Sequence, residues 1–150
     1  KKLFGVFRHR INDLSFPLFR GFDDEFYAPH SRHTTILAEE VNRHPDLTIL
    51  SDSEEAGVYI VASRGGREFY VTGHSEYSPL TLHKEYLRDK EKGMDSVALP
   101  ENYYKNNDPS QPPLVQWRSH AYLLYINWLN YFVYQATPFN IADIAQLGDI

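Results

Sequence analysis

Cysteine is absent from this 150-residue chain, so the chain can form no disulfide and offers no thiol nucleophile. That absence suits a reducing compartment such as the cytoplasm. No apolar run approaches the roughly 18 residues of a membrane-spanning helix, and no signal peptide is visible. Basic residues number 15 against 20 acidic ones, and the net charge of −5 argues against nucleic-acid and anionic-membrane partners.

What the chain has is apolar and aromatic material for one domain. Hydrophobic residues make up 42 % of it and aromatic residues 15 %, which suits a packed interior or an interface. No repeat, low-complexity tract or domain boundary is visible. The chain begins on Lys1 and Lys2 rather than on Met, directly before an expected strand. We therefore expect it to be part of a larger protein.

Apolar patterns and turn residues predict a series of strands and helices. Strands are expected at 3–7, 47–50, 57–62 and 69–72, with the last two forming a hairpin through the turn at 64–67. Segment 21–32 is expected to be a loop with a short strand, and segment 94–111 a long loop. Helices are expected at 37–43, at 80–92 between a Ser78 cap and Gly93, and from 114 or 117 to about 135 as a buried helix.

An imidazole and a carboxylate, His74 and Glu76, follow directly after the strand that begins at Phe69. We expect this strand to be buried and Gly73 to supply the turn after it. A histidine beyond the end of a buried strand lies where α/β sheets present chemistry. With one residue between them, the two side chains can share one side of an extended segment, and the carboxylate can orient the ring as in a nucleophilic triad. The alternative is a surface loop with an incidental pair.

The next helix carries a second candidate group, since Thr81, Glu85 and Arg88 lie on one helical face. The functional interpretation is recognition of a zwitterion, with Arg88 on a carboxylate and Glu85 favouring an ammonium group or holding Arg88. The alternative is a solvated surface ion pair of little energetic consequence.

Other polar residues are better explained by structure than by chemistry. His30 and His33 have a spacing that zinc could use, but no third ligand is convincingly spaced, so no metal site is predicted. The segment 117–120 is expected to anchor a loop, and Asn127 and Asn130 to satisfy buried hydrogen bonds. No serine lies in a G-x-S-x-G elbow, so the nucleophile that a His–Glu pair would activate is missing.

Seven motifs occur in order along nearly the whole chain: Leu3-Phe4-Gly5-Val6-Phe7, Arg20-Gly21-Phe22-Asp23-Asp24, Ala28-Pro29-His30-Ser31-Arg32, Val71-Thr72-Gly73-His74-Ser75-Glu76-Tyr77, Glu85-Tyr86-Leu87-Arg88-Asp89, Trp117-Arg118-Ser119-His120 and Asn127-Trp128-Leu129-Asn130-Tyr131. Together they resemble the carboxyl-terminal half of the homoserine O-acyltransferase family (homoserine O-succinyltransferase and O-acetyltransferase, MetA type).

The resemblance implies an α/β fold of the class I glutamine-amidotransferase-like, flavodoxin-like three-layer kind. It implies a ping-pong reaction in methionine biosynthesis, in which a Cys–His–Glu triad moves an acyl group from acetyl-CoA or succinyl-CoA to the hydroxyl of L-homoserine. Acyl-CoA is a co-substrate, and neither a metal nor a prosthetic group is implied. The full-length enzyme is expected to be a cytoplasmic homodimer.

Within that resemblance, His74 matches the catalytic base and Glu76 the carboxylate that orients it. The family's Gly-His-Pro-Glu-Tyr reads Gly-His-Ser-Glu-Tyr here, so Ser75 replaces a rigid proline, and we expect a small geometric effect. The cysteine-bearing amino-terminal half has no counterpart in residues 1–150. The chain alone is therefore expected to be inactive.

Four further positions match residues that contact the acceptor. Arg88 and Glu85 match positions that hold the amino acid, and Lys2 and Ser31 match further substrate contacts, with Ser31 bearing on specificity. Two alternatives stay open. The acceptor could be serine, because one methylene is worth only about 1–3 kcal/mol of discrimination. The chain could also be a non-catalytic, amidotransferase-like binding module.

Overall fold

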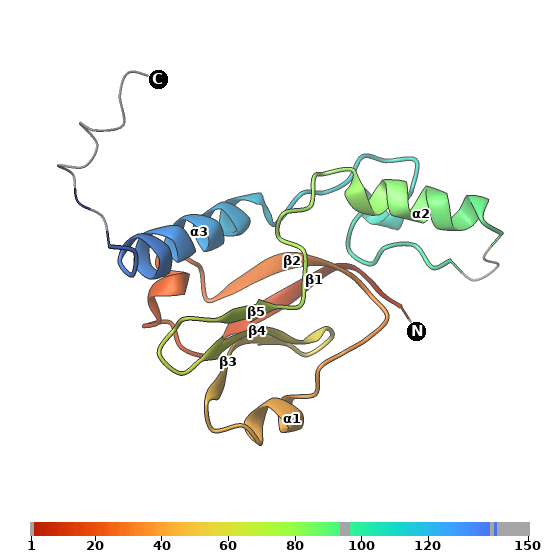
Figure 1. Ribbon diagram of the computed structural model, residues 1–150. Coiled ribbons are helices and arrows are strands. Elements are labelled where there is room, and N and C mark those ends of the chain that lie inside the picture. Colours follow the sequence, from red (N-terminus) through yellow and green to blue (C-terminus); the bar gives the residue numbers. More distant parts are fainter. Residues whose placement is uncertain (1, 94–96, 139, 141–150) are drawn as a thin grey trace.

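The computed structural model describes residues 2–93, 97–138 and 140 (Figure 1). Its strands are β1 (Leu3–Ile11), β2 (Glu25–Arg32), β3 (Leu47–Ser53), β4 (Gly57–Ser63) and β5 (Phe69–Val71). Its α-helices are α1 (Ala38–Asn42), α2 (Thr81–Glu91) and α3 (Arg118–Trp128). Two short 3₁₀ helices, η1 (Pro17–Phe19) and η2 (Lys105–Asn107), and a π-helix, η3 (Leu129–Tyr134), complete the described elements. The mixed α/β class expected from the sequence is confirmed.

The five strands form one sheet in the order β2-β1-β3-β4-β5, and the ladders of the described residues are all antiparallel. The predicted hairpin is confirmed, because β4 pairs with β5 and Ile60 lies opposite Val71. The sheet's edges are therefore β2 and β5. In Figure 1 helices lie on both sides of this sheet, with α3 and α2 on one side and α1 beyond the other.

Strand β2 is longer than the sequence suggested. We expected mainly a loop over 21–32, but residues 25–32 pair with β1 along nearly its whole length, from Leu3 opposite Arg32 to Arg10 opposite Glu25. Pairing with the regular strand β1 favours a strand here despite the polar residues of the segment. Pro29 is tolerated inside β2 because an edge strand can spare a donor.

Strand β5 was expected to be buried, and this is wrong. Tyr70 is 48 % exposed and Val71 is 42 % exposed, because β5 is a three-residue edge strand. Phe69 is the partly buried member, and its ring packs edge-on against Phe132 of η3 with centroids 4.7 Å apart. The segment that carries His74 and Glu76 therefore leaves the sheet at its margin.

Two apolar clusters hold the helices on the sheet. One lies under α3 and η1 and is formed by Leu18, Phe19, Phe26, Ala28, Leu50, Tyr59, Ile60, Ala62 and Leu124. The other lies under α2 and the segment after it and is formed by Phe4, Val6, Leu82, Tyr103, Tyr104 and Trp117. Together they fix α2 and α3 relative to the strand ends between them.

Helix α2 lies within the expected range, and Gly93 follows it with φ of +67°, as expected for a C-terminal glycine. The predicted Ser78 cap is wrong. Its hydroxyl lies 2.9 Å from the hydroxyl of Thr81 and makes no cap bond to the backbone. Helix α1 falls inside the expected 37–43 segment. The start of the expected 94–111 loop lies outside the described residues, and the rest of that segment includes η2.

The last helix is not the buried helix that was expected. Leu124 and Asn127 are the residues of α3 that are buried, whereas Tyr122 is 67 % exposed and Trp128 is 41 % exposed. Helix α3 packs on η1 and β2, and the side chains of Tyr122, Tyr125 and Trp128 are exposed. No helix among the described residues is long and apolar enough to span a membrane.

The structural interpretation of Asn127 is confirmed. Its buried side-chain amide donates to the carbonyl oxygens of Leu18 (2.9 Å) and Arg20 (2.8 Å). Trp117 likewise anchors a loop, because its indole N–H donates to the Tyr77 carbonyl at 3.1 Å. These two side chains fix α3 to the loops on either side of the site.

Candidate active site

The predicted pair forms. His74 Nδ1 lies 2.9 Å from Glu76 Oε1, with 35 % of the imidazole side chain and 54 % of the carboxylate side chain exposed. A carboxylate can only accept, so Nδ1 carries the proton and the neutral ring keeps its lone pair on Nε2. That nitrogen can take a proton from a bound hydroxyl, and Glu76 then stabilises the imidazolium.

The two side chains meet across a tight turn and not along an extended segment. The Tyr77 N–H donates to the His74 carbonyl at 3.1 Å, which places Ser75 and Glu76 at the two central positions of a β-turn. The backbone before the turn is fixed to two strands. The His74 N–H donates to the Pro29 carbonyl (2.8 Å), and the Thr72 N–H donates to the Tyr59 carbonyl (2.9 Å).

Gly73 is required by close packing, which differs from the expected reason. We expected it to supply an unusual backbone turn, but its φ is not positive. A Cβ at this position would lie 2.7 Å from Tyr59 Cε2 and 2.8 Å from His30 Nε2. The backbone just before His74 therefore rests directly on two buried rings.

The predicted acceptor residues also come together. Glu85 Oε2 accepts from the Ser31 hydroxyl (2.5 Å) and lies 3.4 Å from Lys2 Nζ. Burial alone would raise the pKa of Glu85. Hydrogen bonds from Ser31 and Tyr77 and the charge of Lys2 outweigh it, so the pKa lies below its ordinary value. Glu85 is therefore a fixed negative charge that can face an ammonium group.

Arg88 is half exposed and is held by Asp89, a neighbour for which no role was predicted. Its Nε and Nη2 atoms lie 2.8 and 2.7 Å from Asp89 Oδ1. Asp89 Oδ2 also contacts Lys2 Nζ at 3.1 Å. Asp89 lies one helical turn after Glu85, so the acidic i, i+4 spacing was the available signal for a shared lysine. With 54 % of its side chain exposed, Arg88 remains able to take a carboxylate.

Tyr77 joins the His74–Glu76 pair to Glu85. Its ring stacks on the His74 imidazole, with centroids 4.4 Å apart and planes 8° from parallel. Its hydroxyl donates to Glu85 Oε1 at 2.9 Å. Burial and the neighbouring Glu85 raise the pKa of Tyr77, so the hydroxyl keeps its proton. Tyr77 lies in one of the seven motifs, but no role was predicted for it.

An open pocket of about 660 Å³ lies beside the pair, a size typical of small-molecule sites. Its lining includes His74, Glu76, Phe69, Tyr70, Tyr125 and Trp128. The imidazole is therefore reachable from a side formed by α3 and β5.

His30, weighed above as a metal ligand, is buried and serves the core. Its Nε2 lies 3.0 Å from His9 Nε2, and His9 Nδ1 lies 2.9 Å from the Phe7 carbonyl. The carbonyl must accept from His9 Nδ1, so His9 Nε2 accepts from His30 Nε2–H. Burial lowers the pKa of His9 to about 4 and that of His30 further still. Among the described residues no group of three or more side chains could hold a metal ion.

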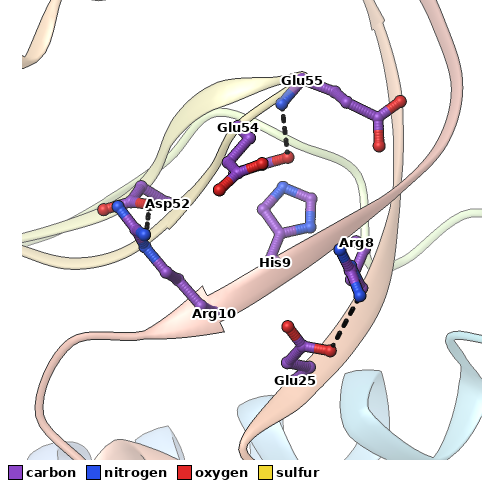
Figure 2. A pocket seen from close by; sticks show the side chains of 8 residues that line it. Arg8, His9, Arg10, Glu25, Asp52, Glu54 and Glu55 are labelled. Carbon is purple, nitrogen blue, oxygen red and sulfur yellow. Dashed lines mark hydrogen bonds and ion pairs between the residues drawn. The ribbon is translucent and has the colours of Figure 1, made fainter.

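A second, smaller hollow of about 120 Å³ lies beside His9 and is lined by residues of β1, β2 and the end of β3 (Figure 2). Four of its charged side chains form two ion pairs: Arg8 contacts Glu25 at 3.2 Å, and Arg10 contacts Asp52 at 2.7 Å. Glu54 and Glu55 also line the hollow. Figure 2 shows the His9 ring between these two ion pairs. This hollow contains no base with an oriented carboxylate, so its chemistry differs from that at His74.

Comparison with known proteins identifies the family of the chain. A family model described as homoserine O-succinyltransferase matches residues 1–139. The chain belongs to this family. A homoserine O-acetyltransferase of Parabacteroides distasonis is 60 % identical over 149 residues, covering 99 % of this chain and 48 % of the relative. One of Bacteroides fragilis is 62 % identical over 144 residues, covering 96 % and 47 %. The chain thus spans about half the length of these homoserine O-acyltransferase relatives.

One solved structure shares the fold at low sequence identity. The crystal structure titled SMU.1228c matches with a TM-score of 0.55 and 12 % identity, over 85 % of this chain and 51 % of that chain. This likeness supports a common mixed α/β fold.

Proposed function

We propose that this chain is the carboxyl-terminal half of a homoserine O-acyltransferase and supplies its general base and its acceptor site. The observation that carries the proposal is Tyr77, which stacks on His74 and donates to Glu85. This link supports a single site that contains both the proton-accepting nitrogen of His74 and the residues proposed to hold the amino acid. An incidental surface pair would have no such connection.

The proposed reaction has two stages, and residues of this chain act mainly in the second. The acyl group first moves from acyl-CoA to a cysteine of the other half, and CoA leaves. The hydroxyl oxygen of homoserine then attacks the thioester carbonyl while His74 Nε2 takes its proton. The carbon–sulfur bond breaks, and the thiolate recovers a proton from the imidazolium that Glu76 has stabilised.

The acceptor cluster, which consists of Lys2, Ser31, Glu85 and Arg88, suits an amino acid. Arg88 can bind a carboxylate in a bidentate manner, and Glu85 can face an ammonium group. Lys2 and Ser31 hold the Glu85 carboxylate in place by contacts of 3.4 and 2.5 Å. The names of the P. distasonis and B. fragilis relatives support acetyl-CoA as the donor.

We further propose that the complete protein has the class I glutamine-amidotransferase-like, flavodoxin-like three-layer fold. The antiparallel sheet described above would be the portion that carries the base. A homodimer remains the prediction for the full-length enzyme.

The proposal is tested with a chimera in which this chain replaces the matching 149-residue segment of the P. distasonis relative. CoA release is measured with acetyl-CoA or succinyl-CoA, and with L-homoserine or L-serine. We expect homoserine-dependent release by the chimera and none by the 150-residue chain alone, because the chain has no cysteine. A folded chimera without turnover would favour a non-catalytic module, and a preference for L-serine would overturn the acceptor assignment.

A further inference from the structure

The residue between the two catalytic candidates makes a buried contact of its own. Ser75 is only 8 % exposed, and its hydroxyl oxygen lies 2.5 Å from the hydroxyl oxygen of Tyr59. Tyr59 belongs to β4 and is completely buried. The contact thus joins the catalytic turn to the interior of the sheet.

Tyr59 is a rigid anchor. Its ring lies 4.4 Å from the His9 ring, 5.5 Å from the His30 ring and 5.7 Å from the Phe26 ring, measured between centroids. Its Cε2 atom also limits the space at Gly73. Burial raises the pKa of Tyr59, so its hydroxyl keeps a proton and can hydrogen-bond to Ser75. The ring cannot shift without disturbing the packed core around it.

Ser75 occupies the first central position of the His74–Tyr77 turn. Proline is favoured at that position because its ring fixes φ near the value that the turn needs. Serine has no such restraint, so the turn needs another. The side chains that must meet, His74 and Glu76, lie on either side of this residue, and their 2.9 Å contact depends on the turn.

We propose that Tyr59 and Ser75 are positioning residues, whose hydroxyl–hydroxyl bond fixes the catalytic turn in place of a proline and so holds His74 against Glu76. This inference rests on the proposed function for its kinetic readout alone. Its structural readout is the tautomer of the His74 ring, which can be measured whether or not the chain takes part in catalysis.

The test compares wild type, Tyr59→Phe, Ser75→Ala, the double variant and Ser75→Thr, with Ser78→Ala as the matched control. The Ser78 hydroxyl bonds Thr81 near the start of α2 and does not touch the turn. In the 150-residue chain, nitrogen NMR of the His74 ring reports how much of it carries the proton on Nδ1, the form that donates to Glu76. Thermal unfolding is followed in parallel.

Each variant that removes one hydroxyl should lower the ratio of the Nδ1–H form to the Nε2–H form on the order of fivefold. The double variant should lower it no further, because both changes remove the same bond. Ser75→Thr, which keeps a hydroxyl, and Ser78→Ala should leave the ratio unchanged. In the chimera kcat should fall by a similar factor, with the homoserine KM unaltered.

A second arm asks whether proline replaces the bond. In a Ser75→Pro background, adding Tyr59→Phe should leave the His74 tautomer ratio unchanged. The proposal is overturned if Tyr59→Phe and Ser75→Ala lower the unfolding temperature but leave the His74 tautomer unchanged, or if their effects on that ratio add. If the variants lower the Nδ1–H fraction of His74 but the wild-type chimera is inactive, the positioning role stands and the proposed reaction is wrong.

Discussion

Two contacting pairs that contain histidine, His9–His30 and His74–Glu76, lie on either side of Gly73 and differ in burial and in partner. His9 and His30 are buried and contact each other through ring nitrogens 3.0 Å apart. His74 is partly exposed and contacts a carboxylate 2.9 Å away. Between them lies Gly73, whose missing side chain lets the turn rest on the His30 ring.

The difference shows how environment decides what an imidazole does. In the buried pair, any added proton would have to be carried in an apolar interior next to another ring, and the Arg32 guanidinium opposes it as well. In the open pair, the Glu76 carboxylate accepts a hydrogen bond from the His74 ring, and solvent can reach both side chains. The first pair is suited to holding the core, and the second to moving a proton.

The largest expected effect separates the two pairs by function. His74→Ala in the chimera should lower kcat about 10²- to 10⁴-fold, because the proton acceptor is lost. The free energy of unfolding should change by less than about 0.5 kcal/mol, since the side chain is partly exposed and outside the core. Steady-state CoA release and urea unfolding measure the two quantities. Near wild-type kcat would mean that another group is the base.

The buried pair should make the fold sensitive to acid. Below pH 6.5 the unfolded chain protonates His9, whereas the folded chain resists until about pH 4. The unfolded state therefore binds more protons, so stability falls as the pH falls through this window. At about 1.4 kcal/mol per pH unit, His9 alone contributes a loss on the order of 3 kcal/mol.

Urea unfolding at pH 7 and pH 4.5, with NMR of the ring nitrogens, checks this fall in stability. The exposed His33→Ala variant serves as a control, because it leaves the buried pair intact and should show the same fall. A folded chain whose His9 ring gains its proton near pH 6.5 would contradict the neutral buried pair.

The acceptor cluster near the exposed His74–Glu76 pair can be tested through Arg88. Arg88→Lys in the chimera should raise the homoserine KM roughly ten- to a hundredfold, because a lysine cannot copy a bidentate contact worth about 1.5–3 kcal/mol. Formation of the acyl-enzyme should be little changed, since that stage does not involve the acceptor. Rapid-mixing measurements of both stages decide the matter. Blocked acyl-enzyme formation with an unchanged KM would assign Arg88 to the donor site or to the fold.

Gly73→Ala tests the boundary between the two pairs. The new methyl group would meet two rings that cannot move freely, which costs about 1–3 kcal/mol. The turn that carries His74 must move away from these two rings to make room for the methyl group, so kcat should fall as well. The matched control is Gly65→Ala, where the added Cβ meets no neighbouring atom, although its φ of +88° adds backbone strain. If Gly65→Ala lowers kcat as much as Gly73→Ala does, close packing is not the reason for this glycine.

The sequence predicted the parts of this site that depend on local order. The hairpin before His74, the His74–Glu76 pair and the position of Glu85 on a helix follow from spacing within short segments. The meeting of Ser31, Lys2 and Glu85 was reached through resemblance, because no local pattern tells which distant residues share a carboxylate. Tyr77 and Asp89 were within reach, since each lies in a motif beside an assigned residue.

Other features depend on contacts between distant segments, and local sequence patterns do not predict such contacts. The local sequence around Tyr59 predicts only that it lies in a strand, and it does not predict a contact with Ser75. The regular strand at 25–32 follows from pairing with β1 rather than from its own polar pattern. The apolar sequence of α3 predicted burial, but the pattern does not say which element covers each face. The exposed Tyr122 is the clearest instance.

The most direct test of the account is a titration of the 150-residue chain with L-homoserine, followed by NMR of the histidine rings and the Arg88 guanidinium. We predict saturable shifts of His74 and Arg88 with one shared dissociation constant. The buried His9 and His30 rings should not respond, and Arg88→Lys should weaken both responses. Shifts confined to one of the two groups, or no saturable shift at either, would contradict the claim that the base and the acceptor cluster form a single site.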